Sequence, residues 1–201
     1  MIKKQNPTKD YYNVNAEKWV EKKFHSFYHE KEFRLFRSKL KKGDRVLDIG
    51  CANGIHVPLF LGIGHELKYE GIDISNSFLK MAKSRYPQLS FVQTDLLDEK
   101  SFPRKKYDGF WAGAVLMHIP LDSWPQMLAN IQNHMKSGAI GYISVPQERF
   151  ANHESDTRHF EIFTVESFKK QIGINGWKVL QTGKKESTAA TDWLWFLVQL
   201  P

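Results

Sequence analysis

The residues of this 201-residue chain whose types and spacing can do chemistry begin with a glycine-rich turn. Gly50, Ala52 and Gly54 follow an apolar run at residues 46–47, so the backbone there can turn tightly and approach a ligand. Asp48 lies two positions before the first glycine, and the spacing differs from the G-x-G-x-x-G pattern of dinucleotide sites. A carboxylate there favours a ligand with positive charge, such as an ammonium group beside a sulfonium, over a pyrophosphate. Taken alone, the turn is equally compatible with a structural role.

Two further carboxylates follow the next two apolar runs. Asp73 ends the run Gly71-Ile72-Asp73, 23 residues after Gly50, where it can accept hydrogen bonds from both hydroxyls of a ribose. Asp95 ends the following run and can accept from an adenine amino group. Strand ends of a parallel sheet meet at one crevice, so the three carboxylates are expected to lie together. Each of them can instead cap a helix, but that interpretation requires three coincidences.

With these residues the chain resembles the class I S-adenosylmethionine-dependent methyltransferases of the small-molecule type, over nearly its whole length. Residues 48–54 are similar to the first motif of the family, Asp73 to its ribose-binding acid, Asp95 to its adenine-binding acid, and residues 107–118 to its fourth strand and following turn. The resemblance implies S-adenosylmethionine (SAM) as cofactor, S-adenosylhomocysteine (SAH) as product, and no metal. It implies these cofactor-binding residues: Tyr12, Trp19, Asp48, Gly50, Ala52, Gly54, Asp73, Ile74, Asp95, Leu96, Ala112 and Val115.

Two details refine the resemblance. Tyr12, Ala16 and Trp19 are similar to a Tyr-x-x-x-Ala-x-x-Tyr leader helix that folds over the cofactor. Ala52 stands where the family usually has glycine, and its methyl group narrows the turn slightly.

Two motifs that this sequence lacks reduce the range of possible methyl acceptors. Methylation at carbon 5 of a pyrimidine needs a cysteine nucleophile, and the single cysteine, Cys51, lies in the glycine-rich turn. Enzymes that methylate the exocyclic amine of a base carry an Asn/Asp-Pro-Pro-aromatic turn, whereas residues 112–115 read Ala-Gly-Ala-Val. We therefore expect direct methyl transfer to an oxygen, nitrogen or sulfur of a small molecule.

Four residues are candidates for contact with that acceptor. His118 follows the fourth predicted strand, where a neutral imidazole can take a proton from the nucleophile or can simply hold the turn. Arg158 or His159 can pair with an anionic substrate, or with a neighbouring acid as surface residues usually do. Tyr11 is expected to meet the substrate from the leader or to pack there.

The net charge of +7 leaves two alternative functions open. Residues 1–45 hold 13 Lys and Arg against 6 Asp and Glu, and the rest of the chain holds 16 of each. This basic region can recruit tRNA or another RNA as the substrate, but we favour a solvated helical face, because aromatic and basic residues do not alternate there as in a nucleic-acid groove. A non-catalytic module that binds a cofactor or partner is the second alternative, because a fold alone does not imply activity.

The elements that must position these residues alternate between strands and helices after a helical lead-in. This alternation predicts an α/β fold: a doubly wound, mostly parallel seven-stranded sheet with an antiparallel C-terminal hairpin and an N-terminal helical cap. The final pair is antiparallel because residues 183–187 are too few for a crossover helix. The strands are predicted at 46 onward, 69–73, 90–93, 107–115, 140–145, 177–182 and 191–198.

The clearest predicted helix follows Pro120. Trp124, Met127, Leu128, Ile131 and Met135 recur at helical spacing, and Gly138 is expected to stop the helix. Further helices are predicted at residues 28–39 and at 165–172, the latter capped by Thr164.

Length and composition predict one domain with three parts: a helical cap at 1–43, a cofactor-binding half at 44–145 and a substrate-side half at 146–201. The sequence has no apolar run near the ~20 residues of a membrane helix, and its polar N-terminus does not resemble a secretory signal. We therefore expect a cytoplasmic protein without a membrane partner.

Overall fold

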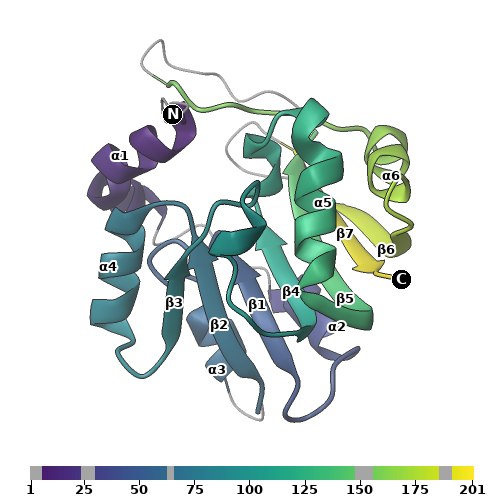
Figure 1. Cartoon of the computed structure of the whole chain (residues 1–201), viewed down its shortest axis with the longest axis horizontal. Coiled ribbons are helices and arrows are strands. Elements are labelled where there is room, and N and C mark those ends of the chain that lie inside the picture. Colours follow the sequence, from purple (N-terminus) through teal and green to yellow (C-terminus); the bar gives the residue numbers. More distant parts are fainter. Residues whose placement is uncertain (1–5, 24–29, 63–65, 148–155, 186–191) are drawn as a thin grey trace.

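The computed structural model describes residues 6–23, 30–62, 66–147, 156–185 and 192–201. Within these ranges the chain forms a seven-stranded sheet in the order β3-β2-β1-β4-β5-β7-β6, with helices on both faces (Figure 1). The strands are β1 (Arg45–Ile49), β2 (Lys68–Asp73), β3 (Ser90–Gln93), β4 (Tyr107–Gly113), β5 (Met135–Pro146), β6 (Lys178–Lys185) and β7 (Trp193–Gln199). The helices are α1 (Pro7–Lys23), α2 (Glu30–Arg37), α3 (Val57–Leu61), α4 (Asn76–Arg85), α5 (Trp124–Asn133) and α6 (Val165–Gly173), with short 3-10 turns at η1 (Glu99–Ser101), η2 (Leu116–His118) and η3 (Leu121–Ser123).

The strand directions confirm the predicted fold class. β1 to β5 pair in parallel, whereas β7 lies between β5 and β6 and runs antiparallel to both. The short connection after β6 forces the chain to turn back, so the last strand enters the sheet in the opposite direction. Thr164 caps α6 as predicted, because its side chain accepts from the Ser167 amide.

The prediction of a helix extending to Met135 and stopped by Gly138 is wrong. α5 ends at Asn133, and Met135 already pairs with Tyr107 as the first residue of β5. The next pair joins Gly109 to Ile140, so residues 136–139 bulge out and Gly138 adopts a φ of 73° inside the strand. The helical spacing continued to Met135 because helix and strand bury their side chains in one core cluster.

Other strand ends differ by a few residues. β4 stops at Gly113 and not at residue 115, because Ala114 adopts a left-handed φ of 56° that ends the strand. β6 continues through residues 183–185, which were predicted to be part of the connection. The predicted start of the last strand at 191 lies outside the described residues.

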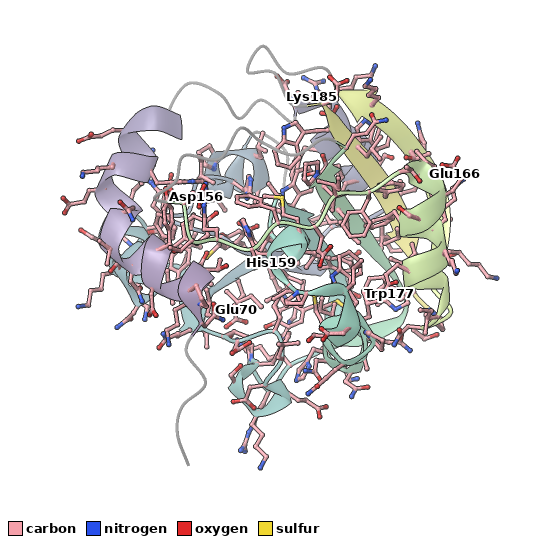
Figure 2. The ribbon with its side chains drawn as sticks, turned by 90° about the horizontal axis from the view of Figure 1, so that it is seen from above. Glu70, Asp156, His159, Glu166, Trp177 and Lys185 are labelled. Atoms are coloured by element: carbon pink, nitrogen blue, oxygen red, sulfur yellow. The ribbon has the colours of Figure 1, made fainter. Side chains whose placement is uncertain are left out.

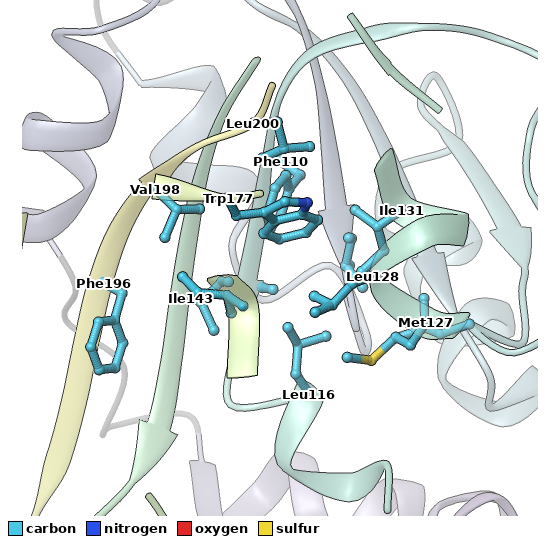
Figure 3. Packing of buried hydrophobic residues seen from close by; sticks show 14 of the residues in the cluster. Phe110, Leu116, Met127, Leu128, Ile131, Ile143, Trp177, Phe196, Val198 and Leu200 are labelled. Atoms are coloured by element: carbon cyan, nitrogen blue, oxygen red, sulfur yellow. The ribbon is translucent and has the colours of Figure 1, made fainter. Parts of the chain in front are cut away.

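The sheet is packed on both faces, as a doubly wound fold requires. Neighbouring residues of a strand point to opposite faces, and in β4 Phe110 joins the cluster under α5 and α6, whereas Trp111 joins the cluster under α2, α3 and α4. Trp111 stacks on Tyr142 of β5 with ring centroids 3.7 Å apart. Figure 3 shows the first cluster, in which Leu128 and Ile131 of α5 face Phe110 and Ile143.

The carboxyl ends of β1 to β4 lie below two covering segments. One is α1, which is held to the start of α4 because Ser75 Oγ donates to Asn13 Oδ1 at 2.9 Å and Ser77 Oγ donates to the Asn13 carbonyl at 2.9 Å. The other is the extended segment 156–163, which crosses from α1 toward α6 (Figures 1 and 2). Any pocket at these strand ends is therefore roofed by residues from both ends of the chain.

No helix among the described residues has the length and apolar character that crossing a membrane requires.

Candidate functional site

A pocket opens at the carboxyl ends of β1, β2 and β4 and beneath α1. Ten of the residues predicted for the site line it: Tyr12, Trp19, Gly50, Ala52, Asp73, Ile74, Asp95, Leu96, Val115 and His118. The other lining residues were not predicted: Asn6, Thr8, Ile49, Ile55, His56, Ile72, Phe78, Thr94, Gly113, Ala114 and Ile119. The predicted residues that do not line it are Tyr11, Asp48, Gly54, Ala112, Arg158 and His159.

The glycine-rich turn forms one wall through left-handed backbone. Gly50 and Gly54 adopt φ values of 71° and 77°, and Ala52 between them adopts 47°. A Cβ added to Gly50 meets Val115 Cγ2 at 2.6 Å, so this position excludes any side chain. Ala52 thus accepts the left-handed conformation that glycine usually supplies, and its methyl group is buried.

Asp73 is held by backbone amides of two segments. Its Oδ2 accepts from the Ala52 amide at 2.9 Å and its Oδ1 accepts from the Ser75 amide at 2.8 Å. Burial raises the pKa of Asp73 to about 6, although these amides favour the charged form. Each carboxylate oxygen accepts more than one hydrogen bond, so the group retains acceptor capacity toward the pocket. This arrangement suits a ligand that presents two neighbouring hydroxyls.

Asp95 lies beyond β3 in a tight local turn. Its Oδ1 accepts from the Leu97 amide at 3.0 Å, and its own amide donates to Ser101 Oγ at 3.0 Å. These bonds fix the carboxyl group beside Leu96 at the pocket wall. The position fits an amino group that donates toward the end of β3.

Asp48 does not reach the pocket, in contrast to its predicted position beside the ligand. Its side chain is fully buried, where Tyr69 OH donates to Oδ2 at 2.8 Å and His56 Nδ1 lies 3.1 Å from Oδ1. The alternation along β1 explains this, because Ile49 points to the pocket side and Asp48 to the opposite one. His56 therefore lines the pocket in its place, and its position two residues after Gly54 was the only signal in the sequence.

Ala112 and Gly54 also lie close to the pocket without lining it. Ala112 is fully buried in the core cluster under α5, one residue before the Gly113 and Ala114 backbone that does line the pocket. The early end of β4 explains the shift, because the chain leaves the sheet there. A Cβ at Gly54 meets the Tyr86 ring at 2.9 Å, so this glycine serves close packing against α4.

At the mouth, Tyr12 and His118 form a hydrogen bond of 2.8 Å between Oη and Nε2. His118 Nδ1 lies 2.7 Å from the His159 carbonyl, which only accepts, so Nδ1 carries the proton and Nε2 accepts from Tyr12. Burial lowers the pKa of His118 to about 4, which keeps the ring neutral. The one lone pair that a neutral imidazole offers is thus occupied by Tyr12.

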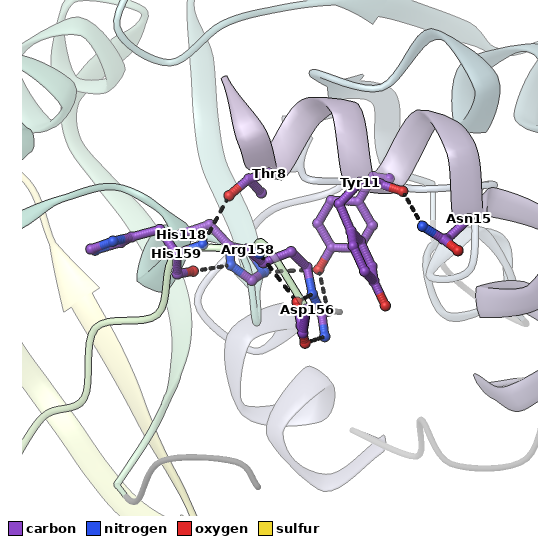
Figure 4. Close-up of polar contacts among 8 residues, drawn as sticks. Thr8, Tyr11, Asn15, His118, Asp156, Arg158 and His159 are labelled. Atoms are coloured by element: carbon purple, nitrogen blue, oxygen red, sulfur yellow. Dashed lines mark hydrogen bonds and ion pairs between the residues drawn. The ribbon is translucent and has the colours of Figure 1, made fainter. Parts of the chain in front are cut away.

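Arg158 lies beside the pocket and donates hydrogen bonds to Asp156 and Tyr12 (Figure 4). Its Nη2 and Nε donate to the two carboxylate oxygens of Asp156 at 2.6 and 2.9 Å, and its Nη1 donates to Tyr12 Oη at 3.0 Å. The guanidinium also lies 4.6 Å from the Tyr11 ring centroid and 4.8 Å from that of Phe160. Its hydrogen bonds lower the pKa of Asp156, so the pair stays charged and mutually neutralised.

His159 is engaged in the same way. Its amide donates to Thr8 Oγ1 at 3.1 Å, and its Nε2 lies 2.8 Å from Glu161 Oε1. Tyr11, Arg158 and His159, all predicted to bind substrate, therefore surround the mouth without lining the pocket.

The described part of the chain contains no group of three or more His, Cys, Asp or Glu side chains that could hold a metal ion.

Comparison with known proteins finds a family model that matches part of the chain. Residues 46–138 match a family model described as a methyltransferase domain. The trans-aconitate 2-methyltransferase of Azoarcus sp. is 26% identical over 113 residues, which are 56% of this chain and 43% of that protein. The chain spans less than half the length of the curated relatives it matches.

Two solved structures share the fold. The 1,6-didemethyltoxoflavin-N1-methyltransferase of Burkholderia thailandensis, solved with 1,6-didemethyltoxoflavin and SAH bound, has a TM-score of 0.79 at 15% identity, covering 96% of this chain and 87% of that one. The [4+2]-cyclase SpnF has a TM-score of 0.76 at 14% identity, covering 96% and 94%. Residues 46–138 therefore match the methyltransferase-domain family model, and the chain as a whole shares its fold with these two solved structures.

Proposed function

We propose that this protein binds SAM and transfers its methyl group to an oxygen, nitrogen or sulfur of a small-molecule acceptor. The observation that carries the proposal is Asp73, whose two oxygens are aimed by the Ala52 and Ser75 amides at the end of β2. A rigid, buried carboxylate beside a glycine-rich turn suits a ribose diol. The match of residues 46–138 to the methyltransferase-domain family supports it.

The remaining wall residues fit the other parts of this cofactor. Asp95 would accept from the adenine amino group, and the backbone of Gly50 and Ala52 would approach the amino-acid end. Tyr12 and Trp19 of α1 would cover the cofactor from above. Bound SAM supplies a methyl group on a sulfonium, which is already reactive toward a nucleophile.

The chain's own contribution to the reaction is alignment. Holding a nucleophile and a methyl group in line supplies several kcal/mol as restricted motion. His118 is neutral, but its Nε2 is occupied by Tyr12, so we assign it to the structure of the mouth and not to proton transfer. A displacement of this type needs no base when the acceptor atom is already nucleophilic.

The acceptor is expected to be uncharged. Among the described residues, the Asp, Glu, Lys and Arg side chains that line the pocket are Asp73 and Asp95, both acidic. Arg158, the nearby cation that was predicted to attract an anion, is neutralised by Asp156. With Asp73 and Asp95 engaged by the cofactor, a polycarboxylate acceptor would find no Lys or Arg side chain among the described residues that line the pocket.

The acceptor's charge can be tested with pairs of neutral phenols or ring nitrogens and their carboxylated analogues, with SAH formation as the readout. We expect at least tenfold higher kcat/KM for the neutral member of a pair. Preference for the carboxylates would contradict this part of the proposal.

The test of the cofactor site is calorimetric titration of SAM into the wild type and Asp73→Ala. Hydrogen bonds to a charged group contribute about 1.5–3 kcal/mol each, so the loss of two predicts at least a 100-fold weaker Kd. Asp122→Ala removes an exposed carboxylate that does not line the pocket and should leave the Kd unchanged. Equal SAM affinity of Asp73→Ala and wild type would refute the ribose site.

Measurements on the same purified protein also distinguish the two alternative functions, RNA methylation and a non-methylating role. None of the described basic side chains before Val46 lines the pocket, so RNA recruitment would have to use an outer surface, and it would weaken steeply with salt. The likeness to the [4+2]-cyclase SpnF indicates that this fold hosts other chemistry. Tight SAM binding without any SAH formation across the acceptor panel would favour a non-methylating role.

A further inference from the structure

An arginine side chain forms a hydrogen bond between the two segments that roof the pocket. Arg158 belongs to the segment 156–163, and its Nη1 donates to Tyr12 Oη of α1, 146 residues earlier in the chain. Tyr12 lines the pocket, whereas Arg158 does not. Arg158 therefore acts on the pocket through Tyr12.

The Tyr12 hydroxyl is held from two sides. It donates its single proton to His118 Nε2 and accepts from Arg158. Burial raises the pKa of Tyr12 to about 12, so the hydroxyl stays protonated and keeps this direction of donation. Two directed bonds on one hydroxyl fix the orientation of the ring at the mouth.

Arg158 is itself pre-oriented for this contact. Nε and Nη2 donate to both oxygens of Asp156, and the flat guanidinium lies 4.6 Å from the Tyr11 ring centroid and 4.8 Å from that of Phe160. Only 18% of its side chain is exposed. A planar fork held in this way delivers the remaining N–H in one direction, which the flexible ammonium of a lysine does less well.

The roof does not depend on Arg158 for its placement. The His159 amide donates to Thr8 Oγ1, and Asn13 ties α1 to α4 through Ser75 and Ser77. These bonds involve neither Arg158 nor Tyr12. Removing Arg158 should therefore release the Tyr12 side chain and loosen α1 locally, while the elements stay docked.

We propose that Arg158 is a positioning residue that locks Tyr12 and His118 over the pocket and thereby slows the release of the bound cofactor. The role of Tyr12 toward SAM rests on the proposed function, whereas the lock itself exists in the ligand-free protein. Arg158 is thus assigned to retention of the cofactor and not to recognition of an anionic acceptor.

The experiment is a double-mutant cycle with SAH as the probe. Dissociation rates are measured by stopped-flow displacement for wild type, Arg158→Gln, Tyr12→Phe and the double variant. We expect Arg158→Gln and Tyr12→Phe each to raise the rate about 5- to 30-fold, with the double variant no faster than the faster single one, because contacting residues that share one bond are not additive. Arg158→Lys should restore part of the effect, and Arg34→Gln, which breaks an exposed pair on α2, should change nothing.

Several results would overturn the assignment. If Arg158→Gln released SAH within twofold of the wild-type rate, Arg158 would not act through Tyr12. The same conclusion would follow if the effects of the two single variants multiplied in the double variant. Should Arg158→Gln fold poorly, Asp156→Asn and Arg158→Lys test the same bond with smaller changes. An Asp156→Asn variant with the wild-type rate would count against the lock.

A ligand-free readout separates this inference from the proposed function. Hydrogen exchange of residues 7–23 in the absence of SAH should rise in Arg158→Gln and not in Arg34→Gln. If the wild type bound no SAH, the proposed function would fail, and the exchange data would still decide whether Arg158 restrains α1. Unchanged exchange in Arg158→Gln would refute the restraint.

Discussion

The glycine-rich turn and Asp73, which form the floor of the pocket, are held by backbone amides and by left-handed glycine φ angles. At the mouth, by contrast, side chains from distant segments hold each other in position. The floor uses Gly50, Ala52 and Ser75, all within 23 residues of Asp73. The mouth joins Tyr12 to Arg158 and Thr8 to the His159 amide, over separations of 146 and 151 residues.

This difference indicates how each region tolerates change. The floor is part of the sheet itself, so its disruption affects stability and binding together. The mouth depends on a few directed bonds over two docked segments, so its disruption should alter the lifetime of the bound ligand while the fold persists. A rigid floor and an adjustable mouth allow the covering segments to change while the site beneath them is kept.

The largest expected effect is at the floor, with Gly50→Ala. The new Cβ lies 2.6 Å from Val115 Cγ2, and the φ of 71° is strained for alanine, so we expect about 2–4 kcal/mol loss of unfolding free energy and at least 100-fold weaker SAH binding. Gly43→Ala is the matched control, because its φ is 85° but nothing lies within 4 Å of the added Cβ. Urea unfolding and calorimetry measure both. An effect no larger than that of Gly43→Ala would mean that Val115 shifts to accommodate the added methyl group.

An intermediate effect is expected from pH, and it should separate the two regions. The pKa of Asp73 is raised to about 6, so lowering the pH from 7 to 5 protonates it and removes the negative charge that strengthens its hydrogen bonds from the ribose. SAH affinity should therefore fall by up to about tenfold per pH unit below 6, and Asp73→Ala should lose this dependence. His118, with a pKa lowered to about 4, stays neutral over this range, so His118→Gln should keep the wild-type pH profile. A profile that changed in His118→Gln would assign the titration to the mouth.

The smallest effect is expected for Ala52→Gly, which restores the usual family residue. Glycine relieves the left-handed strain of about 1–2 kcal/mol but costs up to about 1 kcal/mol in the unfolded chain. The two terms nearly cancel, so unfolding free energy should change by less than about 1 kcal/mol and SAH affinity by less than threefold. A larger gain in affinity would show that the Ala52 methyl group obstructs the turn.

Sequence patterns predicted the floor more fully than the mouth. Gly50, Asp73 and Asp95 sit at strand ends, and strand ends follow from apolar runs and their spacing along the chain. Asp48 was predicted beside the ligand but points to the other face of β1. The sequence does not say which face of β1 each side chain points to, because this depends on which side of the strand α3 packs against. Met135 was placed in a helix because both helix and strand present it to the same core.

The sequence by itself determined the parallel sheet, the antiparallel closing pair, the glycine-rich turn and the carboxylates Asp73 and Asp95, since each depends on residues close together in the chain. Only the tertiary structure decided that His56 replaces Asp48 at the wall, that His118 gives its lone pair to Tyr12, and that Arg158 is neutralised by Asp156. The physical reason is that charge and hydrogen-bonding capacity are set by partners in space. A residue that looks free in the sequence is often already bound when segments more than 100 residues apart come together.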